Sequence, residues 1–120
     1  MSNIWIIGIT CAFMLADIIS GFLKAWKSHD IKSRALREGL FHKAAFLGVI
    51  GLAQLTELAA DKIPEIEFDL PITGAICAYI ILTEIVSVLE NLRDINPDIG
   101  GSRNRVPAQP ADEPEAHDKE

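Results

Sequence analysis

The sequence predicts an all-α membrane protein with three transmembrane helices, on the basis of three observations. Apolar runs of about twenty residues cover positions 4–23, 40–60 and 70–89. A helix of that length is about 30 Å long, which matches the hydrocarbon core of a bilayer. A basic connection joins the first two runs, and the last part of the chain is polar, with repeated proline and glycine. We therefore expect residues 1–92 to form one transmembrane domain and residues 93–120 to form a disordered, acidic cytoplasmic tail.

The first run, residues 4–23, contains a single charged residue, Asp17. It lacks the preceding basic residues and the small-residue cleavage site that define a secretory signal peptide. We therefore expect a retained transmembrane helix. Trp5 and Trp26 lie near its two ends, where aromatic residues typically anchor helices at the membrane interface.

The second run, residues 40–60, has an uninterrupted apolar centre at Ala44–Ala53, with Lys43 and Glu57 near its ends. Ala44 and Gly48 are four residues apart, and small residues at that spacing let helices in lipid approach closely. Taken alone, this run also fits a buried helix of a soluble protein. Its assignment to the membrane therefore depends on its two neighbours.

The third run, residues 70–89, has Glu84 as its only charge. Pro71 falls in its first turn, where a missing backbone N–H costs little. Cys11 and Cys77 each lie within an apolar run and have no cysteine or histidine partner at metal-ligand spacing. We interpret both as small residues that fill the core.

The distribution of basic residues predicts the orientation of the chain. The first connection and its flanks hold six of the eleven Lys and Arg residues, whereas the second connection holds only Lys62. By the positive-inside rule, the N-terminus lies outside and the C-terminus inside the cytoplasmic membrane. The basic residues of the first connection that set this topology are Lys27, Lys32, Arg34 and Arg37. An open alternative is that they also hold anionic lipid headgroups.

Three charged residues within the runs are candidates for a functional cluster. A carboxylate inside a hydrocarbon core costs roughly 2.5–3.5 kcal/mol, so it is seldom idle. Asp17 and Glu84 lie about 9 Å and 7.5 Å from the inner ends of their runs, at nearly the same depth. Lys43 enters from the same side. We therefore predict an intramembrane cluster of these three side chains, within one subunit or between subunits.

Polar residues recur at helical spacing around this predicted cluster. The polar faces comprise Ser20, Gly21 and Lys24 on the first helix and Ser87 and Asn91 on the third. Such faces should contact protein or water rather than lipid. Three interpretations remain open: static packing of three helices, a subunit contact or lesion wall in an assembly, and a proton or ion relay.

Enzymatic function and nucleic-acid binding are not expected. The chain shows no nucleophile–histidine–acid set, no glycine-rich phosphate loop and no metal-ligand cluster, and its three histidines are scattered. We therefore expect no catalytic residue, no cofactor and no metal. The net charge of −6 argues against nucleic acid as a partner. The expected partners are the lipid bilayer and further copies of the chain.

Short motifs in this order resemble the phage lysis and toxin-secretion holin family. Asp-Ile-Ile-Ser-Gly at 17–21 is followed by Lys24, Ser33, Glu-Gly-Leu at 38–40 and Lys43, and Thr83–Leu92 resembles the closing element of that family. The likeness covers roughly residues 10–100. Asn96-Pro97 stands in place of the family's prolyl segment, and the acidic extension after Arg105 has no counterpart.

The resemblance implies a small holin of the host inner membrane. Such a protein oligomerises into lesions that release an endolysin, without requiring direct contact with that enzyme, and so times host-cell lysis. The alternative is an antiholin-like regulator or a small anchor subunit that forms no pore. A soluble helical interaction module is a third class, which the three long apolar runs disfavour.

Overall fold

The computed structural model describes residues 3–67 and 69–99 and contains three helices in that part of the chain. They are α1 (Ile4–Lys27), α2 (Ser33–Lys62) and α3 (Ile72–Ile95). All three are long and apolar enough to cross a membrane. With 24, 30 and 24 residues, they are about 36, 45 and 36 Å long. The expected all-α architecture, with three helices able to span a membrane, is confirmed in the described residues.

Each helix extends beyond the apolar run that predicted it, because polar residues at the membrane interface continue the helical backbone. α2 gains the most, since it begins at Ser33 rather than near residue 40. α3 continues to Ile95, so the domain boundary expected at residue 93 falls inside a helix. Residues 100–120 of the expected tail lie outside the described part of the chain.

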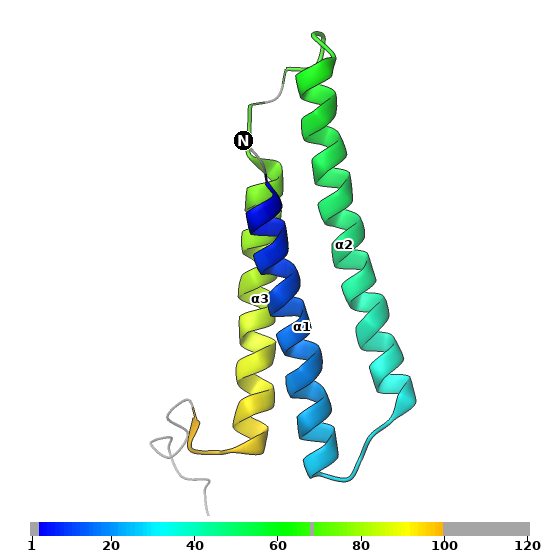
Figure 1. Ribbon diagram of the computed structural model, residues 1–120, viewed down its shortest axis with the longest axis vertical. Coiled ribbons are helices and arrows are strands. Elements are labelled where there is room, and N and C mark those ends of the chain that lie inside the picture. The colour runs from blue at the N-terminus through cyan, green and yellow to red at the C-terminus, as the bar shows by residue number, and fades with distance from the viewer. Residues whose placement is uncertain (1–2, 68, 100–120) are drawn as a thin grey trace, which may run out of the picture.

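The three helices alternate in direction, so α1 and α3 run parallel and α2 runs antiparallel to both (Figure 1). α1 packs closely on α3, whereas α2 contacts α3 less and α1 hardly at all. A Cβ added at Gly21 would lie 3.6 Å from Asn91 Nδ2, which shows how closely α1 and α3 approach. A Cβ at Gly48 of α2 would meet nothing within 4 Å. The close packing expected of Ala44 and Gly48 therefore does not occur within one copy of the chain.

The basic connection begins with a compact turn that ends α1. His29 has a φ of 56°, and its left-handed conformation reverses the chain. The N–H of Asp30 donates to the carbonyl of Ala25, and the N–H of His29 donates to that of Trp26. These bonds form a Schellman-type ending, in which glycine is the usual residue at the left-handed position. Histidine is among the non-glycine residues that tolerate it.

Proline helps to end α2. Ile63 precedes Pro64 and has the extended backbone that a following proline enforces. At the start of α3, Pro71 precedes the first helical residue and provides no side-chain cap. The N–H groups of the first turn of α3 therefore need acceptors from elsewhere in the protein.

The interior of the bundle is unusually polar and its surface unusually apolar. Half of the buried residues in the described ranges carry polar side chains: Thr10, Ser20, Lys43, Thr73 and Glu84, against Met14, Ile50, Ala53, Cys77 and Ile80. Large apolar side chains cover the outside, with Leu52, Leu55 and Leu82 all more than 60% exposed. A protein in water would bury such residues, whereas lipid solvates them. Cys77 fills the core as expected; Cys11 is exposed, which corrects the expectation for that residue.

Candidate functional site

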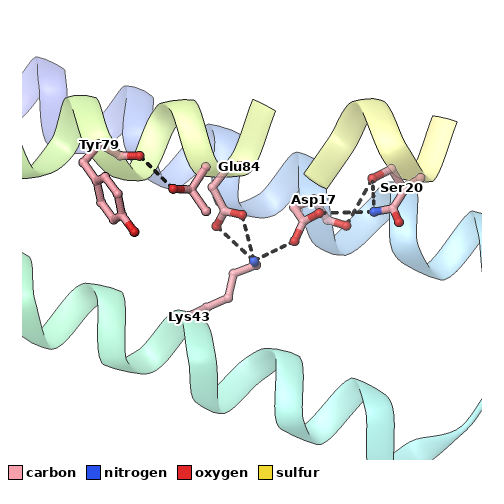
Figure 2. A network of polar contacts seen from close by, with 7 residues as sticks. Asp17, Ser20, Lys43, Tyr79 and Glu84 are labelled. Carbon is pink, nitrogen blue, oxygen red and sulfur yellow. Dashed lines mark hydrogen bonds and ion pairs between the residues drawn. The ribbon is translucent and has the colours of Figure 1, made fainter. Parts of the chain in front are cut away.

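The predicted charged residues meet in the interior, where each helix contributes one of them. Lys43 Nζ of α2 lies 2.7 Å from Asp17 Oδ2 of α1. The same nitrogen lies 3.1 and 2.9 Å from Glu84 Oε1 and Oε2 of α3. Figure 2 shows the lysine reaching from α2 to both carboxylates. We call these three residues the carboxylate–lysine cluster. It provides the principal polar link between α2 and the α1–α3 pair at this depth.

Two neutral side chains complete the surroundings of Asp17. Asn91 Nδ2 of α3 donates to Asp17 Oδ1 at 3.1 Å and to Ser20 Oγ at 3.0 Å. Ser20 Oγ in turn donates to the backbone carbonyl of Asp17 at 3.2 Å. Both Asp17 oxygens therefore have a partner, and α1 and α3 are joined by hydrogen bonds beside the ion pairs. The helical spacing of these residues brings them onto one face of each helix.

The charged side chains of the cluster are largely buried, so their pairing strongly affects the energy of the protein. The Glu84 side chain is 2% exposed and the Lys43 side chain 9%, whereas Asp17 retains 18%. Two carboxylates share one ammonium group, so the fully ionised cluster carries one excess negative charge. Buried ion pairs add little stability when complete, but removing one partner leaves an uncompensated charge at a high cost. The cluster is therefore sensitive to any movement that takes Lys43 away.

A second polar cluster joins the helices at the end of the bundle where α3 begins, away from the carboxylate–lysine cluster near the middle. Glu57 of α2 accepts a hydrogen bond from the backbone N–H of Thr73 at 2.7 Å and one from Asn3 Nδ2 at 3.0 Å. Gln54 Nε2 donates to Thr73 Oγ1 at 2.9 Å. We call Asn3, Gln54, Glu57 and Thr73 the Glu57 cluster. Its carboxylate caps the first turn of α3, where Pro71 supplies no acceptor of its own.

A cavity separates α1 from α2 at the end that holds the basic connection. Its volume is about 530 Å³, and its lining includes Asp17, Gly21 and Lys43 at the inner limit and Ser28 and Lys32 near the connection. Because this cavity reaches Asp17 and Lys43 but is not lined by Glu84, one side of the carboxylate–lysine cluster faces open space and the other faces packed protein.

The remaining predicted residues of the polar faces lie around this cavity or at the α1–α3 contact. Ser87 and Lys24 line the cavity, and Gly21 permits the approach of Asn91. Lys24 does not join the carboxylate–lysine cluster; it pairs with Asp94 of α3 at 3.1 Å. The terminal turns of α1 and α3 are thus joined by an ion pair near the surface.

The basic residues of the connection form only peripheral contacts. Lys27 Nζ donates to the carbonyl of Ile95 at 2.6 Å. Lys32 lies 3.8 Å from Asp30, and Arg34 lies 3.6 Å from Glu38 in the next turn of α2. Arg37 is exposed. This arrangement leaves the positive charges at the end of the bundle, where they fit a role in orienting the chain.

The Glu57 cluster was not predicted from the sequence. A signal was nevertheless present: no Ser, Thr, Asp or Asn stands immediately before α3, so its first N–H groups lacked a local acceptor. Glu57 lies near the end of α2 that leads into the short connection to α3. The ion pair of Lys24 with Asp94 was missed because Asp94 had been placed in the tail.

Comparison with known families identifies the chain at the level of its family. The family model described as "Bacteriophage holin family" matches residues 2–100. Comparisons with curated proteins and with solved structures gave no match. The match covers most of the sequence and all three helices, so the chain belongs to the bacteriophage holin family. It is a multi-pass membrane protein of a lysis family, and it is not an enzyme.

Proposed function

We propose that this member of the bacteriophage holin family oligomerises in the inner membrane of its host and forms lesions. The lesions would release a cell-wall-degrading endolysin and set the time of lysis. Family membership and three membrane-capable helices support the proposal. The observation that carries its mechanism is the placement of Lys43 between Asp17 and Glu84, at the contact of the loosely packed α2 with the other helices.

The proposed orientation places the N-terminus outside and the C-terminus inside. The basic connection between α1 and α2 supports it, since six Lys and Arg residues lie between positions 24 and 43. The carboxylate–lysine cluster then lies in the inner half of the bilayer. In this orientation the polar chain beyond α3 extends into the cytoplasm.

We propose that the cluster closes the single copy and opens in the lesion. When α2 stays on the α1–α3 pair, the lysine and the two carboxylates satisfy one another within the protein. If α2 moves away, all three charges need water, because an isolated charge in hydrocarbon is very costly. A lesion with an aqueous lumen supplies that water. The same residues therefore favour the closed chain in lipid and the separated helices in a water-filled assembly.

The membrane potential can bias this equilibrium because the ionised cluster carries excess charge. One charge that crosses the whole membrane changes in energy by about 2.3 kcal/mol per 100 mV. The excess charge of the cluster would move across only part of the membrane when the helices separate. The potential therefore changes the energy of that movement by only a fraction of this value. A fall in potential would then shift the population toward separated helices.

Timed lysis after induced expression tests the proposal. We expect Asp17→Asn and Glu84→Gln each to shift the lysis time, because each leaves an electrically neutral cluster that the potential no longer biases. The double variant leaves Lys43 without a carboxylate and should change the timing most. Unchanged timing in all three variants would refute the proposed role of the cluster.

Two controls make the timing interpretable. Glu38→Gln removes an exposed acid of α2 outside the cluster, and its lysis time should equal that of the unmodified chain. Expression of the chain without an endolysin separates a holin from an antiholin-like regulator or anchor. A holin should stop growth abruptly and collapse the membrane potential by itself. Continued growth with a stable potential at equal membrane abundance would contradict the lesion-forming function.

A further inference from the structure

The cavity between α1 and α2 has the form of an amphipathic pocket beside the basic connection. Apolar walls come from Ile18 and Ala25 of α1 and from Leu36 and Leu40 of α2. Lys24, Ser28, Asp30 and Lys32 lie at the end near the connection, and the paired Asp17 and Lys43 close the inner end. In a membrane, this end reaches the headgroup region, while the apolar walls extend toward the acyl chains. A pocket so placed matches the division of a phospholipid into a polar head and an apolar tail.

Charges of both signs line the pocket in equal number. The three ammonium groups belong to Lys24, Lys32 and Lys43, and the three carboxylates to Asp17, Asp30 and Glu90. Lys43 and Asp17 are already paired at 2.7 Å within the carboxylate–lysine cluster. Lys24 pairs with Asp94 at 3.1 Å and Lys32 lies 3.8 Å from Asp30, but their side chains are 46% and 68% exposed, so each ammonium group can still donate to a ligand. Glu90 is also exposed and forms no hydrogen bond or ion pair with the described residues around it.

We propose that this pocket binds one phosphatidylethanolamine molecule from the leaflet that contains the α1–α2 connection. Lys24 and Lys32 would donate to its phosphate, and Glu90 would accept hydrogen bonds from its primary ammonium group. One acyl chain would lie between Leu36 and Leu40 of α2 and the facing side of α1. The bound lipid thereby fills the space that the divergence of α2 leaves.

The chemistry of the lining selects this headgroup over two common alternatives. A phosphatidylglycerol headgroup is an anion without a cationic part, so it would leave the Glu90 carboxylate uncompensated. A phosphatidylcholine headgroup is zwitterionic, but its quaternary ammonium has no N–H to donate. Phosphatidylethanolamine provides both a phosphate acceptor and charged N–H donors, and charge-assisted hydrogen bonds are the stronger kind. The proposal does not depend on lesion formation, since it concerns the single copy of the chain.

Native mass spectrometry of the full-length chain in detergent tests this assignment. The chain would be equilibrated with equal amounts of phosphatidylethanolamine and phosphatidylcholine that carry identical acyl chains. We expect one retained lipid per chain, predominantly phosphatidylethanolamine. Glu90→Gln should lower the ratio of the two bound lipids by roughly tenfold, which corresponds to about 1.4 kcal/mol. Lys32→Gln should weaken retention of both lipids, because both contain the phosphate.

Matched variants remove the same charge outside the pocket. Glu38→Gln controls for Glu90→Gln, and Arg37→Gln controls for Lys32→Gln; neither should alter retention. Circular dichroism would verify that each variant keeps its helical content. Equal retention of both lipids by the unmodified chain would overturn the proposal, as would a preference that survives Glu90→Gln. Stronger retention of phosphatidylglycerol in a parallel competition would also overturn it, in favour of a site for anionic lipid.

Discussion

Two polar clusters, one near the middle of the bundle and one at the end where α3 begins, join the same three helices with opposite chemistry. In the carboxylate–lysine cluster, α2 supplies a cation to the acids of the other helices, Asp17 and Glu84. In the Glu57 cluster, α2 supplies the acid, and its partners are neutral donors, among them the backbone N–H of Thr73. The first cluster joins charged groups and the second completes a helix terminus.

This difference indicates which contact can work as a switch. Separation of Lys43 from its partners exposes three charges, and their energy depends strongly on whether lipid or water surrounds them. Separation of Glu57 exposes one charge and a few N–H groups at the end of a helix, where the interface is near. The carboxylate–lysine cluster should therefore respond to its surroundings, whereas the Glu57 cluster should act mainly as a structural cap. Three substitutions test this contrast.

The largest effect is expected from Lys43→Gln. This change leaves the Asp17 and Glu84 carboxylates close together without their cation, and breaking a buried ion pair in this way costs roughly 3–5 kcal/mol. The free energy of unfolding should fall by about that amount in an SDS titration of the purified chain. We also expect α2 to separate from α3, which can be followed as increased solvent accessibility of Cys77.

Lys62→Gln is the control for this prediction, because it removes a lysine of the same helix that is 69% exposed. Its expected loss is below about 1 kcal/mol, as for other surface pairs. Combining Lys43→Gln with Glu84→Gln should recover part of the stability, since one unpaired carboxylate disappears. Equal losses for the Lys43 and Lys62 variants would show that the buried cluster does not hold α2.

The carboxylate–lysine cluster was predictable from the sequence because its residues stand out against apolar runs and can be placed by depth. Counting residues from the ends of the runs put Asp17 and Glu84 at one level, and the structure brings both to Lys43. Counting residues gives the depth of a side chain but not the direction in which it points around the helix axis. The sequence therefore did not reveal that Lys24 pairs with Asp94, or that Asn91 donates to both Asp17 and Ser20.

The fold was predictable at the level of helices and less so at the level of packing. Hydropathy identifies the membrane-spanning segments, but it does not predict the angle between α2 and the packed pair of α1 and α3. Small residues at Ala44 and Gly48 indicated a close contact that one copy of the chain does not make. Their exposed position leaves them available for a contact between copies, which a single sequence cannot distinguish from one within the chain.

An intermediate and local effect is expected from Glu57→Gln. Glutamine retains one acceptor oxygen but loses the negative charge that favours the N-terminus of α3. Amide exchange at Thr73 should become faster, while exchange around Glu84 should remain unchanged. Hydrogen exchange in detergent micelles resolves the two regions, and Glu65→Gln in the exposed connection is the control. Faster exchange throughout α3 would mean that the two clusters open together.

The smallest effect is expected at the turn that ends α1, and it has the opposite sign. His29 adopts a φ of 56°, and a left-handed conformation costs a side-chain-bearing residue about 1 kcal/mol relative to glycine. His29→Gly should therefore raise the free energy of unfolding by up to about 1 kcal/mol in the same SDS titration. Ser28→Gly is the control. Ser28 has a φ of −87°, so glycine relieves no strain there and removes the hydrogen bond from Ser28 Oγ to the carbonyl of Ala25.

Because His29 touches neither cluster, its variant should stabilise the chain without changing the lysis time. A shift in timing would mean that the stability of the connection, rather than the charges of the carboxylate–lysine cluster, governs the release of α2.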